Sequence, residues 1–261
     1  MLCRVAVLAV SIAMLGGCAM KAPHLAANPS GGALTDLGPN SPWYPDHDWL
    51  TPESPEIAGS DSLAELLADR RVVSRAAELA RERRNSLGQA FARSNPYRLM
   101  VHRELEAQGV PIELASVPTV ESGWIPNALG RFVAGLWQFT TDTARAYGLT
   151  VDRRVDQRRD PERSTRAAAS YLRDLYDRFG RWDLALAGYN AGPGRVEEAL
   201  KRRPGATFFE LAEKGLLPET TRRYVPEVLA TALVTQNPER FGLSIETFRA
   251  ASLRRLWNPY S

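Results

Sequence analysis

Cysteine is almost absent from this chain of 261 residues, and its two cysteines, Cys3 and Cys18, both lie near the N-terminus. The sequence after position 18 therefore offers no internal disulfide and no cysteine-based metal site. The three histidines, His24, His47 and His102, are scattered and lack the spacing of metal ligands. We therefore expect neither a metal nor a cofactor.

Long apolar runs are also missing. The run from Val5 to Leu15 follows a lone Arg4 and is far shorter than the about 18 residues that a transmembrane helix needs. An N-terminal strand of the core is the alternative, but it would leave the following Gly16-Gly17-Cys18 unexplained. The proportions are those of a secretory signal peptide, which we place at residues 1–17.

The end of this segment, Leu15-Gly16-Gly17-Cys18, resembles the lipobox of bacterial lipoproteins. The resemblance implies that Cys18 is acylated, for example with palmitate, and becomes the first residue of the mature chain. Several acyl chains on one residue give stable membrane anchoring. Ala19 follows, in place of the Asp that resembles an inner-membrane retention signal. The implied location is the periplasmic face of the outer membrane, with outer-membrane lipid as a partner through Cys18.

Excess charge of one sign is small, because 33 basic residues face 30 acidic ones and leave a formal charge of +3. A balance this close to neutral usually reflects a solvated surface, although its sign suits an anionic polymer. We expect no nucleic-acid partner. Protein partners cannot be assigned from the sequence.

The chain divides by composition. Residues 18–61 carry seven prolines and four glycines, which exclude a helix and predict a flexible tether. From position 62 apolar residues recur at helical spacing, which predicts an N-terminal helical segment over 62–94. A main domain over 95–243 and a C-terminal extension over 244–261 complete the predicted organisation.

Alternating strand patterns are absent, and the main domain reads as helices throughout. The expected class is all-α. The expected helices cover 97–108, 111–121, 140–147, 162–179, 183–190, 194–202, 207–213 and 221–236. The segment 111–121 is apolar on most sides, so we expect it to be a buried central helix that starts at Pro111.

Glu121 ends that buried helix and is followed at once by Ser122-Gly123-Trp124. A carboxylate at a helix C-terminus meets the negative end of the helix dipole, and apolar surroundings penalise its charged form. Both effects raise its pKa, as a general acid requires. Taken alone, such a glutamate is more often an ordinary paired or surface residue.

Four motifs change that interpretation. They are Glu121-Ser122-Gly123-Trp124, Gly135-Leu136-Trp137-Gln138-Phe139, Ala187-Gly188-Tyr189-Asn190-Ala191-Gly192, and Glu219-Thr220-Thr221-Arg222-Arg223-Tyr224-Val225-Pro226. Their content and order resemble the soluble-lytic-transglycosylase (SLT) domain of lytic transglycosylases, most closely the D type of the membrane-bound lytic murein transglycosylases. The resemblance covers about residues 95–243.

The resemblance implies a goose-type, lysozyme-like fold whose groove binds peptidoglycan glycan strands. Glu121 would be the catalytic acid, and Ser122 would help to set the end of its helix. Gln138 would bind the sugar or the loop after Glu121, and Tyr189 would hold the carboxyl or the substrate N-acetyl group. Asn190 would orient neighbouring groups, and Tyr224 would line the reaction subsite. We expect Trp124 and Trp137 to be core residues before sugar contacts, because buried aromatic side chains mostly pack.

The motifs supply one carboxylic acid where glycosidases ordinarily use two. A single acid fits substrate assistance, in which the muramic N-acetyl group supports the anomeric centre and a 1,6-anhydro ring closes without water. This predicts a lyase that cleaves the MurNAc-GlcNAc β-1,4 bond. The alternatives are a goose-type lysozyme-like hydrolase and a non-catalytic peptidoglycan-binding scaffold.

One stretch departs from the family pattern. The loop Asn127-Ala128-Leu129-Gly130-Arg131-Phe132-Val133-Ala134 is about one residue shorter than usual and lacks the usual serine. This puts the rate and the fit of the substrate in doubt, but not the assignment of the acid. The sequence to Ser261 also holds none of the LysM repeats that often follow in such proteins, so we expect the protein to lack them.

Overall fold

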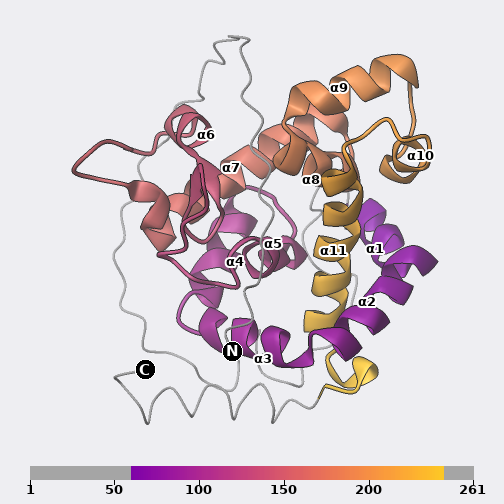
Figure 1. Cartoon of the computed structure of the whole chain (residues 1–261), viewed down its shortest axis with the longest axis horizontal. Coiled ribbons are helices and arrows are strands. Elements are labelled where there is room, and N and C mark those ends of the chain that lie inside the picture. The colour runs from indigo at the N-terminus through magenta and orange to yellow at the C-terminus, as the bar shows by residue number, and fades with distance from the viewer. Residues whose placement is uncertain (1–59, 244–261) are drawn as a thin grey trace.

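A computed structural model describes residues 60–243, which fold almost entirely as helices (Figure 1). The α-helices are α1 Ser60–Ala68, α2 Arg70–Glu82, α3 Arg84–Ser94, α4 Arg98–Ala107, α5 Val117–Glu121, α6 Thr141–Ala146, α7 Pro161–Phe179, α8 Trp182–Ala191, α9 Pro193–Arg202, α10 Phe208–Glu213 and α11 Glu219–Gln236. Short 3₁₀ helices cover Ile112–Ser116 (η1), Gln157–Arg159 (η2) and Glu239–Phe241 (η3). The predicted all-α class is confirmed.

Several predictions fall on segments outside the described residues. These are the signal peptide at 1–17, almost all of the tether at 18–61 and the extension at 244–261. Within residues 60–243, no helix combines the length and the apolar character needed to cross a membrane.

The N-terminal helical segment consists of three helices, where the sequence suggested one. The break after α1 falls at Asp69, whose backbone is extended (φ −58°, ψ 131°) and whose side chain accepts a hydrogen bond from the Arg71 N–H. Asp is a strong helix N-cap because its carboxylate satisfies a donor that the first turn leaves free. The second break, at Arg83, has no side-chain cap.

Helix α11 forms the centre of the packing. It contacts α2 along much of its length and also packs on η1, α8 and α5, while α7 packs against α8 and α4. In Figure 1, α5 lies between α4 and α11 near the middle of the domain. The largest fully buried side chains include Trp137, Trp182 and Phe208. Burial of each such side chain stabilises the fold by about 2–3 kcal/mol.

The expected helix over 111–121 is divided into η1 and α5. Pro111 precedes the first turn as its N-cap rather than opening it. Pro118 has no N–H and cannot donate to the carbonyl four residues earlier, and the Val117 N–H closes a tighter turn on the Leu114 carbonyl. The segment still ends at Glu121, as predicted.

A small hairpin was missed. Strands β1 (Val133–Ala134) and β2 (Phe139–Thr140) pair antiparallel, with Val133 opposite Thr140 and Ala134 opposite Phe139. Strands of two residues are too short to show an alternating pattern. The hairpin carries Gly135 and Gln138 in its connection and thereby positions the second motif.

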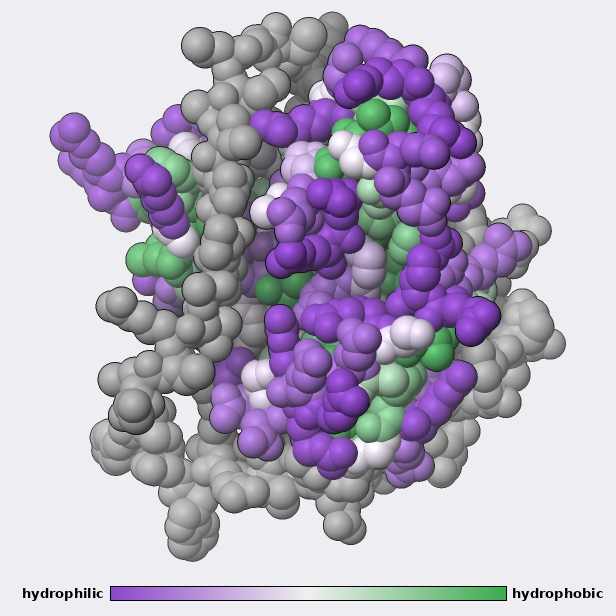
Figure 2. All heavy atoms as spheres, turned by 45° about the vertical axis from the view of Figure 1, so that its right-hand side comes forward, coloured by the Kyte–Doolittle hydropathy of each residue, from purple (hydrophilic) through white to green (hydrophobic). Residues whose placement is uncertain are grey.

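The face shown in Figure 2 is mostly hydrophilic, with smaller apolar areas between the polar groups. Four large apolar side chains among the described residues are exposed: Ile125 at 42%, Leu129 at 69%, Phe132 at 51% and Val155 at 45%. Three of these four follow Glu121 within a dozen residues.

Candidate active site

Glu121 occupies the last position of α5, as the sequence indicated. The helix ends because the Ser122 N–H donates to the Pro118 and Thr119 carbonyls and the chain then turns. Gly123 and Trp124 both adopt left-handed backbone conformations, with φ of +59° and +63°. A non-glycine residue at positive φ is uncommon and needs support from its surroundings.

Three contacts support that turn. The Trp124 indole Nε1 donates to Thr119 Oγ1 at 2.7 Å, and the Trp124 N–H donates to the Pro118 carbonyl at 3.2 Å. From α3, Arg93 Nε donates to the Gly123 carbonyl at 2.6 Å. A Cβ on Gly123 would lie 2.8 Å from the Arg93 guanidinium, so a larger residue there would displace the end of that side chain. The N-terminal helical segment therefore reaches the residue two positions after Glu121.

Glu121 as a whole residue is half-buried, and the burial of its carboxyl raises the pKa of that group to about 7. The Tyr224 hydroxyl acts in the opposite direction and lowers the pKa of Glu121, but burial dominates. No other described carboxylate contributes to the shift. Glu121 thus has a substantial protonated fraction near neutral pH, which suits a general acid.

Two tyrosines lie close to this carboxyl. Tyr224, from the second turn of α11, is buried, and its hydroxyl has no partner with regular hydrogen-bond geometry. It is nevertheless near enough to Glu121 for each group to shift the pKa of the other. Burial and the Glu121 charge also raise the pKa of Tyr189. The structure therefore brings Tyr189 and Tyr224 to Glu121.

Tyr189 lies inside α8, as the expected helix over 183–190 predicts, and this helix continues through Ala191 until Gly192 breaks it at φ +85°. Its hydroxyl donates to the Trp137 carbonyl at 2.8 Å and does not bind the carboxyl directly. The ring packs near Phe139 and Tyr171, with centroid distances of 6.2 and 5.3 Å.

Ser122 and Gln138 join the chain after Glu121 to the hairpin. Ser122 Oγ donates to the Leu136 carbonyl at 2.9 Å and lies 3.2 Å from the Pro118 carbonyl, so it links the end of α5 to the second motif. Gln138, at φ +49°, donates through Nε2 to the Gly135 carbonyl at 2.8 Å and the Ala128 carbonyl at 3.4 Å. Gln138 was expected to bind either the sugar or the loop after Glu121, and the structure shows its contact with that loop.

Asn190 is exposed on the last turn of α8. Its Oδ1 accepts a hydrogen bond from Thr221 Oγ1 at 2.9 Å, and Thr221 is fully buried in the first turn of α11. Asn190 therefore ties α8 to the start of the helix that carries Tyr224. Trp124 and Trp137 are both buried, which confirms the prediction that they are core residues.

Sequence reasoning missed Arg93 and Thr221. Arg93 precedes the motif region, and no local pattern connects it with Gly123, thirty positions later. Thr221 lies within the fourth motif, but its pairing with Asn190 across 31 residues follows only from the packing of α8 against α11.

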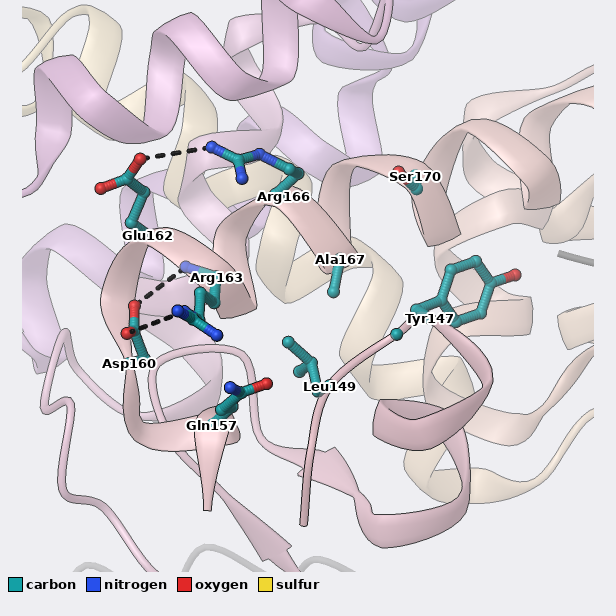
Figure 3. Close-up of a pocket in the computed structure, with 10 residues that line it drawn as sticks. Tyr147, Leu149, Gln157, Asp160, Glu162, Arg163, Arg166, Ala167 and Ser170 are labelled. Atoms are coloured by element: carbon teal, nitrogen blue, oxygen red, sulfur yellow. Dashed lines mark hydrogen bonds and ion pairs between the residues drawn. The ribbon is translucent and has the colours of Figure 1, made fainter. Parts of the chain in front are cut away.

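A pocket of about 400 Å³ lies elsewhere, between the first half of α7 and the segment from Tyr147 to Gln157 (Figure 3). Arg163 and Arg166 line it but form ion pairs with Asp160 and Glu162, respectively. None of the predicted site residues lines this pocket. In the part of the chain that the structure describes, no cluster of His, Cys, Asp or Glu side chains could hold a metal ion.

Comparison with known proteins agrees with this geometry. Residues 100–211 match the family of the transglycosylase SLT domain. Membrane-bound lytic murein transglycosylase D of Escherichia coli (strain K12) is 37% identical over 161 residues, which cover 59% of this chain and 35% of that protein. A putative tributyltin chloride resistance protein of Alteromonas sp. (strain M-1) is 36% identical over 125 residues, covering 46% of this chain and 60% of that protein.

Among solved structures, the 70 kDa soluble lytic transglycosylase SLT70 of Escherichia coli aligns with a TM-score of 0.49 and 27% identity, over 58% of this chain and 26% of that one. The chain spans about a third of the length of the murein transglycosylase D that it matches. Glu121, Gln138 and Tyr189 all lie within the matched region, 100–211. The resemblance found in the four motifs is thus confirmed, in that residues 100–211 match the transglycosylase SLT domain family.

Proposed function

We propose that this protein is a lytic transglycosylase that cleaves the MurNAc-GlcNAc β-1,4 bond of peptidoglycan and leaves 1,6-anhydro-MurNAc ends, for cell-wall remodelling or turnover. The observation that carries the proposal is the state of Glu121, a half-buried residue whose carboxyl has a pKa of about 7 and no coupled second carboxylate among the described residues. The family match supports the same activity.

In the first step, protonated Glu121 donates its proton to the glycosidic oxygen as the bond to the MurNAc C1 breaks. The N-acetyl carbonyl of the same sugar stabilises the positive charge at C1, which replaces the second carboxylate of ordinary glycosidases. Glu121 is left as a carboxylate. The nearby Tyr224 hydroxyl stabilises that anion, because the same interaction lowers the pKa of Glu121.

In the second step, the Glu121 carboxylate accepts the proton of the C6 hydroxyl of the same sugar. The C6 oxygen bonds to C1, the N-acetyl oxygen is released, and the 1,6-anhydro ring closes. Glu121 ends protonated, as it began, and no water is consumed. One group with a pKa near neutrality can serve both as acid and as base, which fits the value found for Glu121.

The remaining residues act by positioning. Ser122 fixes the end of α5 against Leu136, and Gln138 holds the loop after Glu121. Asn190 secures the start of α11, and Tyr189 supports the Trp137 carbonyl beside the carboxyl. We propose that Gln138, Tyr189 and Tyr224 also face the bound sugar.

Mass spectrometry of digested peptidoglycan tests the activity. Purified sacculi treated with the protein should release muropeptides with anhydro ends, each lighter by one water than the hydrolysed equivalent. Glu121→Gln protein, which keeps the side-chain shape but has no transferable proton, is the matched control and should release nothing. Reducing ends would instead indicate a hydrolase, and no products from the wild type would indicate a binding scaffold.

We further propose that the protein is an outer-membrane lipoprotein, anchored by acylated Cys18, whose folded domain lies on the periplasmic face. The support is the Leu15-Gly16-Gly17-Cys18 sequence together with similarity to a transglycosylase named as membrane-bound. Metabolic labelling with a palmitate analogue should mark the wild type and not the Cys18→Ala variant. An unlabelled wild-type protein in the soluble fraction would contradict the assignment.

A further inference from the structure

The segment 127–134, called the 127–134 hairpin below, displays apolar side chains to solvent on an ordered turn. Leu129 is 69% exposed and Phe132 is 51% exposed. The backbone between them is closed by a bridge between Leu129 and Ala134 and by a hydrogen bond of 2.9 Å from the Gly130 N–H to the Val133 carbonyl. These side chains are therefore held in place rather than carried by a loose loop.

Two arginines accompany these apolar groups. The Arg131 guanidinium lies over the Phe132 ring, 5.0 Å from its centroid. Arg159 reaches the base of the hairpin, where its Nε donates to Asn127 Oδ1 at 3.1 Å. Within residues 60–243 neither arginine forms an ion pair, whereas the neighbouring Arg158 pairs with Asp156 at 2.7 Å. The hairpin thus presents apolar surface beside two exposed arginines, of which Arg159 also lies near enough to Asp156 to lower the pKa of that carboxyl.

The hairpin is attached to the proposed catalytic centre. Gln138 Nε2 binds the Ala128 and Gly135 carbonyls at the two sides of the hairpin, and a Cβ on Gly130 would come within 3.3 Å of Gln138 Oε1. Ser122, next to Glu121, binds the Leu136 carbonyl just beyond it. A polymer that places a sugar at Glu121 and Gln138 would therefore carry its substituents past this surface.

We propose that the 127–134 hairpin binds the peptide that peptidoglycan carries on its muramic sugar, and so makes this enzyme prefer peptide-bearing strands. The inference rests on the proposed function. That peptide combines small apolar side chains with free carboxylates, which match the Leu129 and Phe132 surface and the Arg131 and Arg159 charges. Glycan without peptide lacks both the apolar side chains and the peptide carboxylates, so neither the apolar surface nor the arginines would strengthen its binding.

Two substrates prepared from the same sacculi test the proposal: intact peptide-bearing strands, and strands stripped of peptide by an amidase. The full chain and its Leu129→Ser/Phe132→Ser variant are compared by kcat/KM on both. On peptide-bearing strands the variant should lose about tenfold, the effect of removing one aromatic anchor and its neighbour. On stripped strands the two proteins should be equal. Because both side chains are exposed, the melting temperature should not change.

Val155→Ser is the matched control, since Val155 is similarly exposed, at 45%, on a different loop. It should leave the ratio of the two kcat/KM values unchanged. Arg131→Gln should lower that ratio at low salt and lose its effect at high salt, because exposed charges are screened. If the Leu129→Ser/Phe132→Ser variant has the wild-type ratio of kcat/KM on peptide-bearing strands to kcat/KM on stripped strands, the proposal is overturned. The hairpin would then contact a lipid or protein surface instead. An equal loss on both substrates also overturns it, because the contact would then be to the sugar.

Failure of the proposed function is recognised separately. If the wild type cleaves neither substrate, the transglycosylase assignment fails. Binding of the protein to labelled glycan strands with and without peptides, followed by fluorescence anisotropy, then still measures peptide binding. In that assay Glu121→Gln protein with an intact hairpin should bind peptide-bearing strands more tightly than stripped strands, and the same protein with Leu129→Ser/Phe132→Ser should bind both equally.

Discussion

The pH dependence of cleavage follows directly from the burial of Glu121. With a pKa of about 7, the protonated fraction falls from about 0.9 at pH 6 to about 0.1 at pH 8. The rate constant kcat/KM reports the free enzyme, so it should fall about tenfold over this interval and tenfold per pH unit beyond it.

On the proposed mechanism, the protein environment should supply most of the activity expected at neutral pH. A glutamate with the ordinary pKa of 4.5 would be only about 0.3% protonated at pH 7, against about half for Glu121, a roughly 150-fold difference. The Tyr224 hydroxyl opposes burial by stabilising the carboxylate. Tyr224→Phe should therefore move the alkaline limb of the pH profile to higher pH, even if it lowers the maximum rate.

Initial rates of anhydro-muropeptide release between pH 5 and 9, at constant ionic strength, measure both profiles. A midpoint near 4.5 in the wild type would refute the argument that burial sets the pKa of Glu121. A downward movement of the limb in Tyr224→Phe would refute the contribution assigned to the hydroxyl.

Variants at three residues give the remaining predictions. Glu121→Gln should raise stability at alkaline pH, because folding raises the pKa of Glu121 from 4.5 to about 7, so stability is lost as pH rises through that window. Allowing for partial exposure, the gain is about 1–3 kcal/mol at pH 8 and should vanish at pH 4, as measured by thermal melts. Tyr189→Phe removes the 2.8 Å hydrogen bond to the Trp137 carbonyl. This should cost about 1–2 kcal/mol of stability and lower turnover about ten- to a thousandfold. Unchanged turnover would show that the hydroxyl has a structural role only. Arg93→Ala leaves the Gly123 carbonyl without its 2.6 Å partner and should lower kcat about tenfold with little change in KM, while Arg93→Lys recovers part of the loss. An equal loss in the alanine and lysine variants would show that the contact to Gly123 is not what matters.

The sequence predicted the helices of the main domain well, because long amphipathic or buried helices carry clear signals in periodicity and capping. Its errors arose at short-range breaks. Asp69 interrupts an apolar pattern that continues through it, and Pro118 divides a segment whose composition suggests one helix. The hairpin of β1 and β2 is too short to be read from alternation.

The sequence motifs allowed the candidate site residues to be named, but not the contacts between distant segments. Glu121 could be assigned from its place at the end of a buried segment, and its raised pKa follows from the burial that the pattern indicated. The contact between Tyr189 and Trp137 could not be predicted, because it joins residues 52 positions apart and arises only when α8 packs against the chain at Trp137. Arg93 illustrates the same limit, since its contact with Gly123 arises only when α3 packs beside α5.

The packing of α2 along α11 has a consequence for how the molecule unfolds. Glu227 of α11 accepts ion pairs from Arg75 and Arg83, and the buried face of α2, including Val72 and Leu79, belongs to the same core cluster as Val228. The SLT match starts at residue 100, yet a polypeptide cut there would expose the apolar side of α11 to water. We expect the N-terminal helices and the SLT region to unfold in a single cooperative transition. Protease cleavage between α3 and α4, followed by loss of the N-terminal helices, would therefore unfold the whole domain.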